Sequence, residues 1–202
     1  MRGAFLSTLL LAGACASFLR ADDALAVADR LARLHLVYLY GSDDLGKGGL
    51  DCSGFTQTVF RESNGLNLPD EADQQLAYCR EHGQVWDSAS GWTPATLQPG
   101  DLIFFAGPDP SPRTSLVTHV MIYCGGGLMA GAQGKGRQID GTLAGVGYYP
   151  FGLHYPQGIL GESGERFIGH RRVFAYGRLL PVPVSTAHPS GLVAATVPLP
   201  LD

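Results

Sequence analysis

The residues best suited to covalent chemistry lie in the stretch 51–55, Asp-Cys-Ser-Gly-Phe. Cys52 follows a glycine-rich loop and begins a predicted helix, where unpaired backbone N–H groups point out of the helix end. Such groups, together with the helix dipole, stabilise a cysteine thiolate and can bind a developing oxyanion. The pattern is typical of a nucleophilic cysteine, and a buried structural cysteine at a helix start is the alternative.

A thiol nucleophile needs a base, and histidine exchanges a proton near neutral pH. Among six histidines, His119 begins the apolar run 119–123, which predicts a strand that would fix the imidazole at a sheet edge. His154 and His170 remain alternatives without a comparable setting. We therefore expect Cys52 and His119 to meet in the folded chain.

The elements that must position these groups are helices first and short strands afterwards. Helices are predicted over 22–38, over 52–64 with Gly65 as its C-cap, and over 70–82, ended by Gly83. A glycine-rich loop covers 41–49. Strands are predicted near 102–105, 118–124, 128–133, 137–139 and 169–176. This order predicts an α+β fold with an antiparallel sheet.

Both ends of the chain differ from its middle. Residues 1–21 combine Arg2, a short apolar run and small residues, which predicts an export signal that is too short to span a bilayer. The sequence 11–15, Leu-Ala-Gly-Ala-Cys, resembles a bacterial lipobox that would attach a lipid to Cys15, and a plain Ala-x-Ala cleavage site is the alternative. Residues 180–202 are rich in Pro, Ser and Ala and predict a disordered tail. The domain is thus expected over 22–179.

Charge and cysteine spacing exclude some functions. The formal net charge is −4 and there is no run of basic residues, so no nucleic-acid partner is expected. The four cysteines form no C-x-x-C pair and have no histidine at zinc-ligand spacing, so no metal site is expected. A disulfide between Cys79 and Cys124 is left open.

The sequence resembles the NlpC family of papain-like cell-wall cysteine peptidases in four ordered motifs. These are Tyr-Leu-Tyr-Gly-Ser at 38–42, Asp-Cys-Ser-Gly-Phe at 51–55, Leu-Gln-Pro-Gly-Asp-Leu-Ile-Phe-Phe at 97–105 and His-Val-Met-Ile-Tyr at 119–123. The resemblance covers 24–176 and implies a papain-like domain whose N-terminal helices pack on a central antiparallel sheet. It implies cleavage of peptidoglycan stem peptides, typically between γ-D-glutamate and a diamino acid, with no metal or organic cofactor.

The resemblance also assigns roles to individual residues. It implies that Cys52 is the nucleophile and His119 the base, and that Tyr38 lines the site near the oxyanion. It implies that Asp51 and Ser53 help to hold the amino end of the substrate. For Asp51, capping of the helix is an equally good and compatible role.

The sequence departs from the family at the third catalytic position. The family places a polar residue twelve positions beyond the base, where it orients the imidazole, and here that position is Gly131. Residues two apart on a strand share a face, so Gln133 lies on the same face as Gly131. We therefore expect Gln133 to orient His119 after a small shift.

These observations predict an exported, monomeric cysteine endopeptidase of the periplasm or cell envelope, which a lipid on Cys15 would anchor to the membrane. A non-catalytic module that binds cell-wall peptide is one alternative, and Gly131 favours it. An amidase or acyltransferase on the same fold is another, because one fold supports several thiol chemistries.

Overall fold

The chain passes through its helices before it enters its main sheet, as the sequence predicts. The computed structural model describes residues 21–87, 96–106, 115–151 and 172–179. The helices are α1 (Ala21–Ala32), the 3-10 helix η1 (Leu45–Lys47), α2 (Cys52–Asn64) and α3 (Ala72–His82). The strands are β1 (Val37–Tyr38), β2 (Gly49–Leu50), β3 (Gly83–Asp87), β4 (Leu102–Ala106), β5 (Val117–Gly125), β6 (Leu128–Ala132), β7 (Val146–Pro150) and β8 (Arg172–Leu179).

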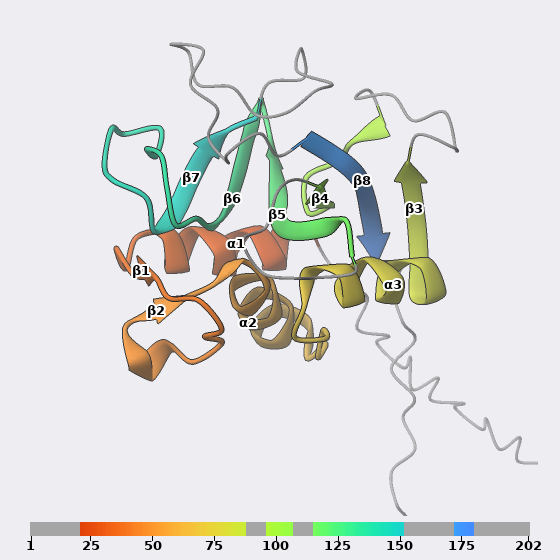
Figure 1. The fold of residues 1–202 in the computed structure, drawn as a ribbon, viewed down its shortest axis with the longest axis horizontal. Coiled ribbons are helices and arrows are strands. Elements are labelled where there is room, and N and C mark those ends of the chain that lie inside the picture. Colours follow the sequence, from red (N-terminus) through yellow and green to blue (C-terminus); the bar gives the residue numbers. More distant parts are fainter. Residues whose placement is uncertain (1–20, 88–95, 107–114, 152–171, 180–202) are drawn as a thin grey trace, which may run out of the picture. The chain divides into compact units, whose positions relative to one another are not determined.

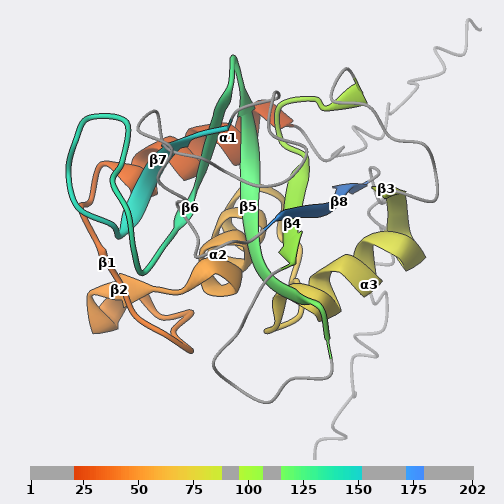
Figure 2. The same cartoon turned by 45° about the horizontal axis from the view of Figure 1, so that its top comes forward.

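Six strands form one sheet in the order β3-β8-β4-β5-β6-β7, and its neighbours pair antiparallel. Figure 1 shows α1, α2 and α3 together below these strands, and in the turned view of Figure 2 α2 passes behind β5 and β6. Contacts agree, because α2 packs on β5 and β6, α3 on β3, β5 and β8, and α1 on β6 and β7. The predicted α+β, papain-like arrangement of N-terminal helices on a central antiparallel sheet is confirmed.

Alternate residues of the central strands enter two different apolar clusters. Val120 and Ile122 of β5 pack with Phe55 and the other buried residues of the helices. Met121, the residue between them, belongs to a second cluster made by the strands and their connections. This alternation is the ordinary consequence of successive strand side chains pointing to opposite faces.

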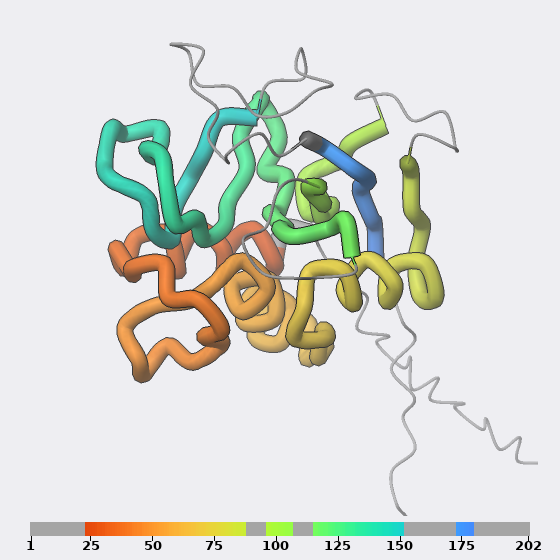
Figure 3. Tube along the Cα trace, viewed as in Figure 1, coloured from red at the N-terminus to blue at the C-terminus, as the bar shows by residue number. Residues whose placement is uncertain are grey.

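The first predicted helix is too long. Helix α1 ends at Ala32, and not at residue 38, because the chain turns and Tyr38 pairs with Leu50 in a short parallel ladder. His35 lies in the turn with a positive φ of 52°, a conformation that ends any helix. The helical spacing of apolar residues continues past residue 32 in the sequence, but the pairing of β1 with β2 ends the helix there. In the tube of Figure 3, the loop that follows β1 leads through β2 directly into α2.

The second helix matches its prediction at both ends. Helix α2 runs from Cys52 to Asn64, and Gly65 caps it in the left-handed conformation with φ 68°. The N–H groups of Gly65 and Leu66 donate to the Arg61 and Phe60 carbonyl oxygens at 3.0 and 3.1 Å. Glycine at this position avoids the strain that a side chain would meet there.

Two strands of the main sheet were not predicted, and one predicted strand is missing. β3 and β7 lie in parts of the chain for which the sequence analysis assigned no helix or strand. Both are edge strands, where partial exposure and residues such as Pro150 weaken the apolar pattern. Around 137–139 there is only an isolated bridge between Arg137 and Leu143. Helix α3 begins two residues later than predicted, and Gly83 starts β3 rather than a left-handed cap.

The predictions about the chain ends fall on residues 1–20 and 180–202, which lie outside the described residues. All described residues belong to one compact unit, 19–181. Within the described ranges, no helix has the length and apolar character needed to cross a membrane.

Candidate active site

The first turn of α2 holds Cys52 at its opening residue. Asp51 is the N-cap, with φ −91° and ψ −175°, so the chain enters the helix from an extended conformation. The Cys52 side chain is buried, with 6% of its surface exposed. The structure therefore places the candidate nucleophile at a capped helix N-terminus, as its motif predicts.

Asp51 joins this turn to the preceding loop with both carboxylate oxygens. Its Oδ1 accepts hydrogen bonds from the Gly54 N–H at 2.7 Å and the Ser53 hydroxyl at 3.0 Å. Its Oδ2 accepts from the Gly41 N–H at 2.9 Å. Its own N–H donates to the Ser42 carbonyl oxygen at 2.9 Å. The capping role of Asp51 is confirmed, and substrate binding by Asp51 and Ser53 stays a prediction.

Gly54 lets the loop pass close against the helix. A Cβ atom at this position would overlap the Ser42 carbonyl oxygen and lie 2.8 Å from the Asp43 Cα. Any side chain would therefore push the loop away from the start of α2. The glycine in the Asp-Cys-Ser-Gly motif has a packing reason that the spacing of the motif does not reveal.

A buried polar network fixes the same turn from the other side. The Thr56 hydroxyl lies 2.8 Å from the Ser53 carbonyl oxygen and 2.7 Å from Gln75 Oε1 of α3. The Gln75 amide donates to the Ser53 and Pro69 carbonyl oxygens at 3.2 and 2.9 Å. Thr56 and Gln75 are fully buried, so these bonds are shielded from water. Sequence reasoning did not single out Gln75, because a glutamine on a polar helix carries no signal of burial.

Tyr38 lies between the start of α2 and the end of β6. It pairs with Leu50, two residues before Cys52. On its other side, a Cβ atom on Gly134 would lie 3.2 Å from Cδ1 of the Tyr38 ring. The structure thus brings the predicted oxyanion-side tyrosine close to the segments that carry Cys52 and Gln133.

His119 is the third residue of β5 and only 1% of its surface is exposed. It pairs with Phe105 of β4, and the two ring centroids are 5.8 Å apart. The ladder shifts register next to this pair, so that Val117 opposes Ala106. A bulge of this kind re-aims side chains at the end of a strand. The predicted base is therefore held rigidly in a buried position.

Gln133 follows β6 directly, and it too is 1% exposed. Its N–H donates to the Gly145 carbonyl oxygen at 2.9 Å, which fixes its backbone. Neither its Oε1 nor its Nε2 has a hydrogen-bond partner among the described residues, and the same holds for the buried Thr118 hydroxyl. Thr118, near the start of β5, and Gln133, just after β6, therefore each hold buried polar atoms without described partners.

Gly131 leaves no room for the side chain that the family places there. A Cβ atom on Gly131 would overlap Met121 Sδ and lie 2.9 Å from Met121 Cε. Met121 is fully buried in the strand-side cluster. The thioether of Met121 therefore occupies the space beside residue 131.

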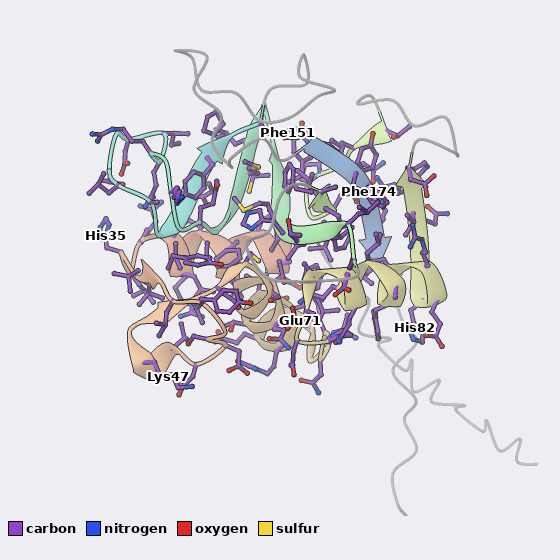
Figure 4. The ribbon with its side chains drawn as sticks, viewed as in Figure 1. His35, Lys47, Glu71, His82, Phe151 and Phe174 are labelled. Carbon is purple, nitrogen blue, oxygen red and sulfur yellow. The ribbon has the colours of Figure 1, made fainter. Side chains whose placement is uncertain are left out.

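His119 and Gln133 lie at one end of the main sheet, and Cys52 lies in the helix-side apolar cluster that also contains Val120 and Ala132. Because β5 and β6 are antiparallel, the start of β5 and the end of β6 meet at one end of the ladder. The histidines labelled in Figure 4, His35 and His82, lie at opposite margins of the molecule. His154 and His170 lie outside the described residues.

The other described thiols are poor candidates for the nucleophile. No disulfide joins the described cysteines, so the possible bond between Cys79 and Cys124 is not formed. Burial raises the pKa of Cys79 to about 12, and nearby Asp101 adds to the effect. Burial likewise raises the pKa of Cys124 to about 12. Both are almost entirely protonated at neutral pH, and only the thiolate is a strong nucleophile. Within the described ranges, no His, Cys, Asp and Glu side chains gather as a metal site.

The comparisons with known proteins agree with this arrangement. A model described as the NlpC/P60 family matches residues 36–149. The chain is 34% identical over 120 residues to a probable endopeptidase p60 of Listeria innocua, a match that covers 59% of this chain and 22% of the relative. It is 31% identical over 107 residues to a gamma-D-glutamyl-L-lysine dipeptidyl-peptidase of Bacillus subtilis, which covers 53% of this chain and 31% of the relative.

The chain thus spans less than a third of the length of either curated relative. A crystal structure of an NlpC/P60 family protein from Bacillus cereus is 27% identical with a TM-score of 0.51. That match covers 82% of this chain and 42% of the solved one.

Proposed function

The chain belongs to the NlpC/P60 family, since the family model matches residues 36–149 of its 202, and on this premise we propose that it is a cysteine peptidase of peptidoglycan stem peptides. The observation that carries the proposal is the position of Cys52, the first residue of an Asp51-capped helix that packs on the strands bearing His119. A capped helix start favours negative charge on a thiol, and a strand holds the base in place.

The proposed reaction proceeds through a covalent thioester. His119 takes the proton from the Cys52 thiol, and the thiolate attacks the peptide carbonyl carbon. The N–H groups at the start of α2, with Tyr38, stabilise the tetrahedral oxyanion. The C–N bond then breaks as His119 gives its proton to the leaving amine, and water hydrolyses the thioester to free Cys52.

We propose the bond between γ-D-glutamate and a diamino acid as the one cleaved. The support is the similarity to the Bacillus subtilis relative, whose name specifies gamma-D-glutamyl-L-lysine. Asp51 and Ser53 would then help to hold the amino end of the stem peptide. Ser53 could do so only by sharing a hydroxyl that now donates to Asp51 at 3.0 Å.

We propose that the protein acts outside the cytoplasm, because peptidoglycan lies there. Residues 1–21 would direct its export, and Cys15 would carry a lipid if the lipobox is used. The mass and N-terminal residue of the mature protein test this directly. A lipid-modified Cys15 at the N-terminus supports anchoring, and an unmodified later residue supports simple secretion.

The test of function is a digest of purified peptidoglycan by the protein from residue 22 onward, with released peptides identified by mass spectrometry. Cys52→Ala is the inactive variant, and Cys124→Ala is its matched control at a partly buried thiol of β5. We expect the wild type and Cys124→Ala to release fragments ending in γ-D-glutamate and Cys52→Ala to release none. Equal cleavage by Cys52→Ala would refute the proposal.

A second candidate is a non-catalytic module that binds cell-wall peptide. The absent side chain at Gly131 favours it. Binding of peptidoglycan by both the wild type and Cys52→Ala, with no cleavage by either, would support this role. Transfer of the acyl group to an added amine, detected in the same digest, would instead indicate an acyltransferase.

A further inference from the structure

The Gln133 side chain has an unusual environment for a polar group. It is 1% exposed, yet neither of its amide atoms has a partner among the described residues. A buried amide without partners lowers the stability of the folded protein, and nearly all buried polar atoms avoid this state. No described contact of the fold uses this amide, which points to a partner during catalysis.

The pairing of β5 with β6 identifies that partner. Ile122 opposes Ala130, and Tyr123 opposes Met129. The overlap that a Cβ on Gly131 would have with Met121 continues the same register by one pair. Extending this register by two more residues on each strand, one residue past the end of β6 at Ala132, sets Gln133 opposite His119. Directly opposed residues of an antiparallel pair lie on the same face with neighbouring Cβ atoms, so the amide is within reach of the imidazole.

Met121 and Gly131 explain why this group stands at position 133. The Met121 thioether fills the space beside residue 131, so that any side chain there would overlap it. The neighbouring pair along the ladder, His119 and Gln133, is where a polar side chain still fits. Met121 of the neighbouring strand β5 therefore fills the volume that a side chain of residue 131 would occupy.

We propose that Gln133 is the positioning residue for His119, a step that rests on the proposed function. Its Oε1 accepts a hydrogen bond from the imidazole N–H that does not face Cys52. The Gln133 amide has no partner in the described structure, and the bond forms when His119 takes the proton from Cys52, because a charged N–H donor makes a stronger hydrogen bond than a neutral one. Gln133 touches neither substrate nor the reacting sulfur in this role.

The test replaces Gln133 by methionine, which keeps the volume and removes the amide, with Gln138→Met as the matched control. Gln138 lies in the same connection between β6 and β7, and its side-chain amide donates to the Leu143 carbonyl oxygen at 3.2 Å. We expect Gln133→Met to lower kcat at least about tenfold with little change in KM, while its Tm stays equal or rises. Gln138→Met should leave kcat unchanged.

Unchanged kcat in Gln133→Met overturns the proposal, and so does a fall in kcat that accompanies a clear fall in Tm. Either outcome leaves the proposed function standing, provided that Cys52→Ala is inactive. Adding Met121→Ala and Gly131→His to Gln133→Met should recover part of the lost kcat, because the new imidazole then has room. Gly131→His without Met121→Ala should recover none.

A readout independent of turnover is the proton NMR signal of the ring N–H groups of charged His119, recorded at a pH low enough to protonate the ring. We expect one of these signals to lie far downfield in the wild type, because the proposed bond to Gln133 Oε1 is made in the charged state, and to move upfield in Gln133→Met. Identical signals in the two proteins overturn the positioning role even if the wild type cleaves nothing. Absent cleavage with a changed signal would instead count against the proposed function alone.

Discussion

The start of α2 and the joined ends of β5 and β6 supply the two halves of the candidate site in opposite states. At the helix start, Asp51 accepts three hydrogen bonds, and Thr56 and Gln75 form a buried network around Ser53. At the strand ends, the Thr118 hydroxyl and both Gln133 amide atoms are buried without described partners. Hydrogen bonds therefore hold the turn that carries Cys52, whereas the polar side chains of Thr118 and Gln133 have no described partners.

This contrast is local, because the far end of β5 is fully paired. There the Tyr123 N–H donates to the Asp101 carbonyl oxygen at 2.8 Å. Arg178 donates to both carboxylate oxygens of Asp101 at 2.7 Å, and its guanidinium lies 4.8 Å from the centre of the Trp86 ring. The Pro-Gly-Asp motif is therefore structural, and the unpaired polar atoms belong to one end of one ladder.

The largest expected contrast is the reactivity of the three described thiols. If the helix start is the reactive region, iodoacetamide at pH 7.5 should label Cys52 and spare Cys79 and Cys124. Burial holds the pKa of both at about 12, so their thiolate fraction is about a thousandfold below that of an ordinary cysteine. Their labelling should rise only as the pH approaches 12. Peptide mapping measures it, with protein unfolded in urea as the control in which all three react.

The next effect concerns the paired end of β5. Arg178→Met leaves the Asp101 carboxylate buried without its partner, which should lower the free energy of unfolding by about 3–5 kcal/mol. Arg80→Met is the control, because Arg80 is half exposed and 3.5 Å from Asp87, and such surface pairs contribute about 0–1 kcal/mol. Urea unfolding compares the two. Equal losses of unfolding free energy in the two variants would show that the Arg178–Asp101 pair stabilises the protein no more than the surface pair Arg80–Asp87.

A smaller loss is expected at the cap of α2. Asp51→Ala removes the acceptor of three N–H or O–H groups and should lower the free energy of unfolding by about 2 kcal/mol. Asp43→Ala, at an exposed position in the same loop, should change it by less than about 0.5 kcal/mol. Urea unfolding again measures both. If Asp51→Ala lowers the free energy of unfolding by less than Asp43→Ala, the hydrogen bonds of Asp51 do not stabilise the start of α2.

The smallest effect tests the contrast most directly, since it makes one substitution in both regions. Thr56→Val removes a hydroxyl with buried partners and should lower the free energy of unfolding by about 1 kcal/mol. Thr118→Val removes a buried hydroxyl without a described partner and should leave stability equal or slightly higher. Thermal and urea unfolding of the pair suffice. The same loss in both variants would remove the distinction between the two regions.

Local sequence carries much of the fold where one segment decides its own structure. Helix α2 is predicted to the residue because Asp51 and Gly65 are strong cap residues at its two ends. The prediction for helix α1 extends too far because its own residues do not indicate that Tyr38 will pair with Leu50. The edge strands β3 and β7 are missed because partial exposure weakens their apolar pattern.

For the candidate site, the sequence by itself determined the chemical types: a thiol at a helix start, a histidine on a strand, and a glycine where the family has a polar residue. These follow from local spacing and from the resemblance of four motifs. Only the tertiary structure decided that Asp51 ties the helix to its loop, that Met121 fills the space beside Gly131, and that the Gln133 amide is buried without a described partner. These facts depend on cross-strand register and on contacts between distant segments, which no single stretch of sequence contains.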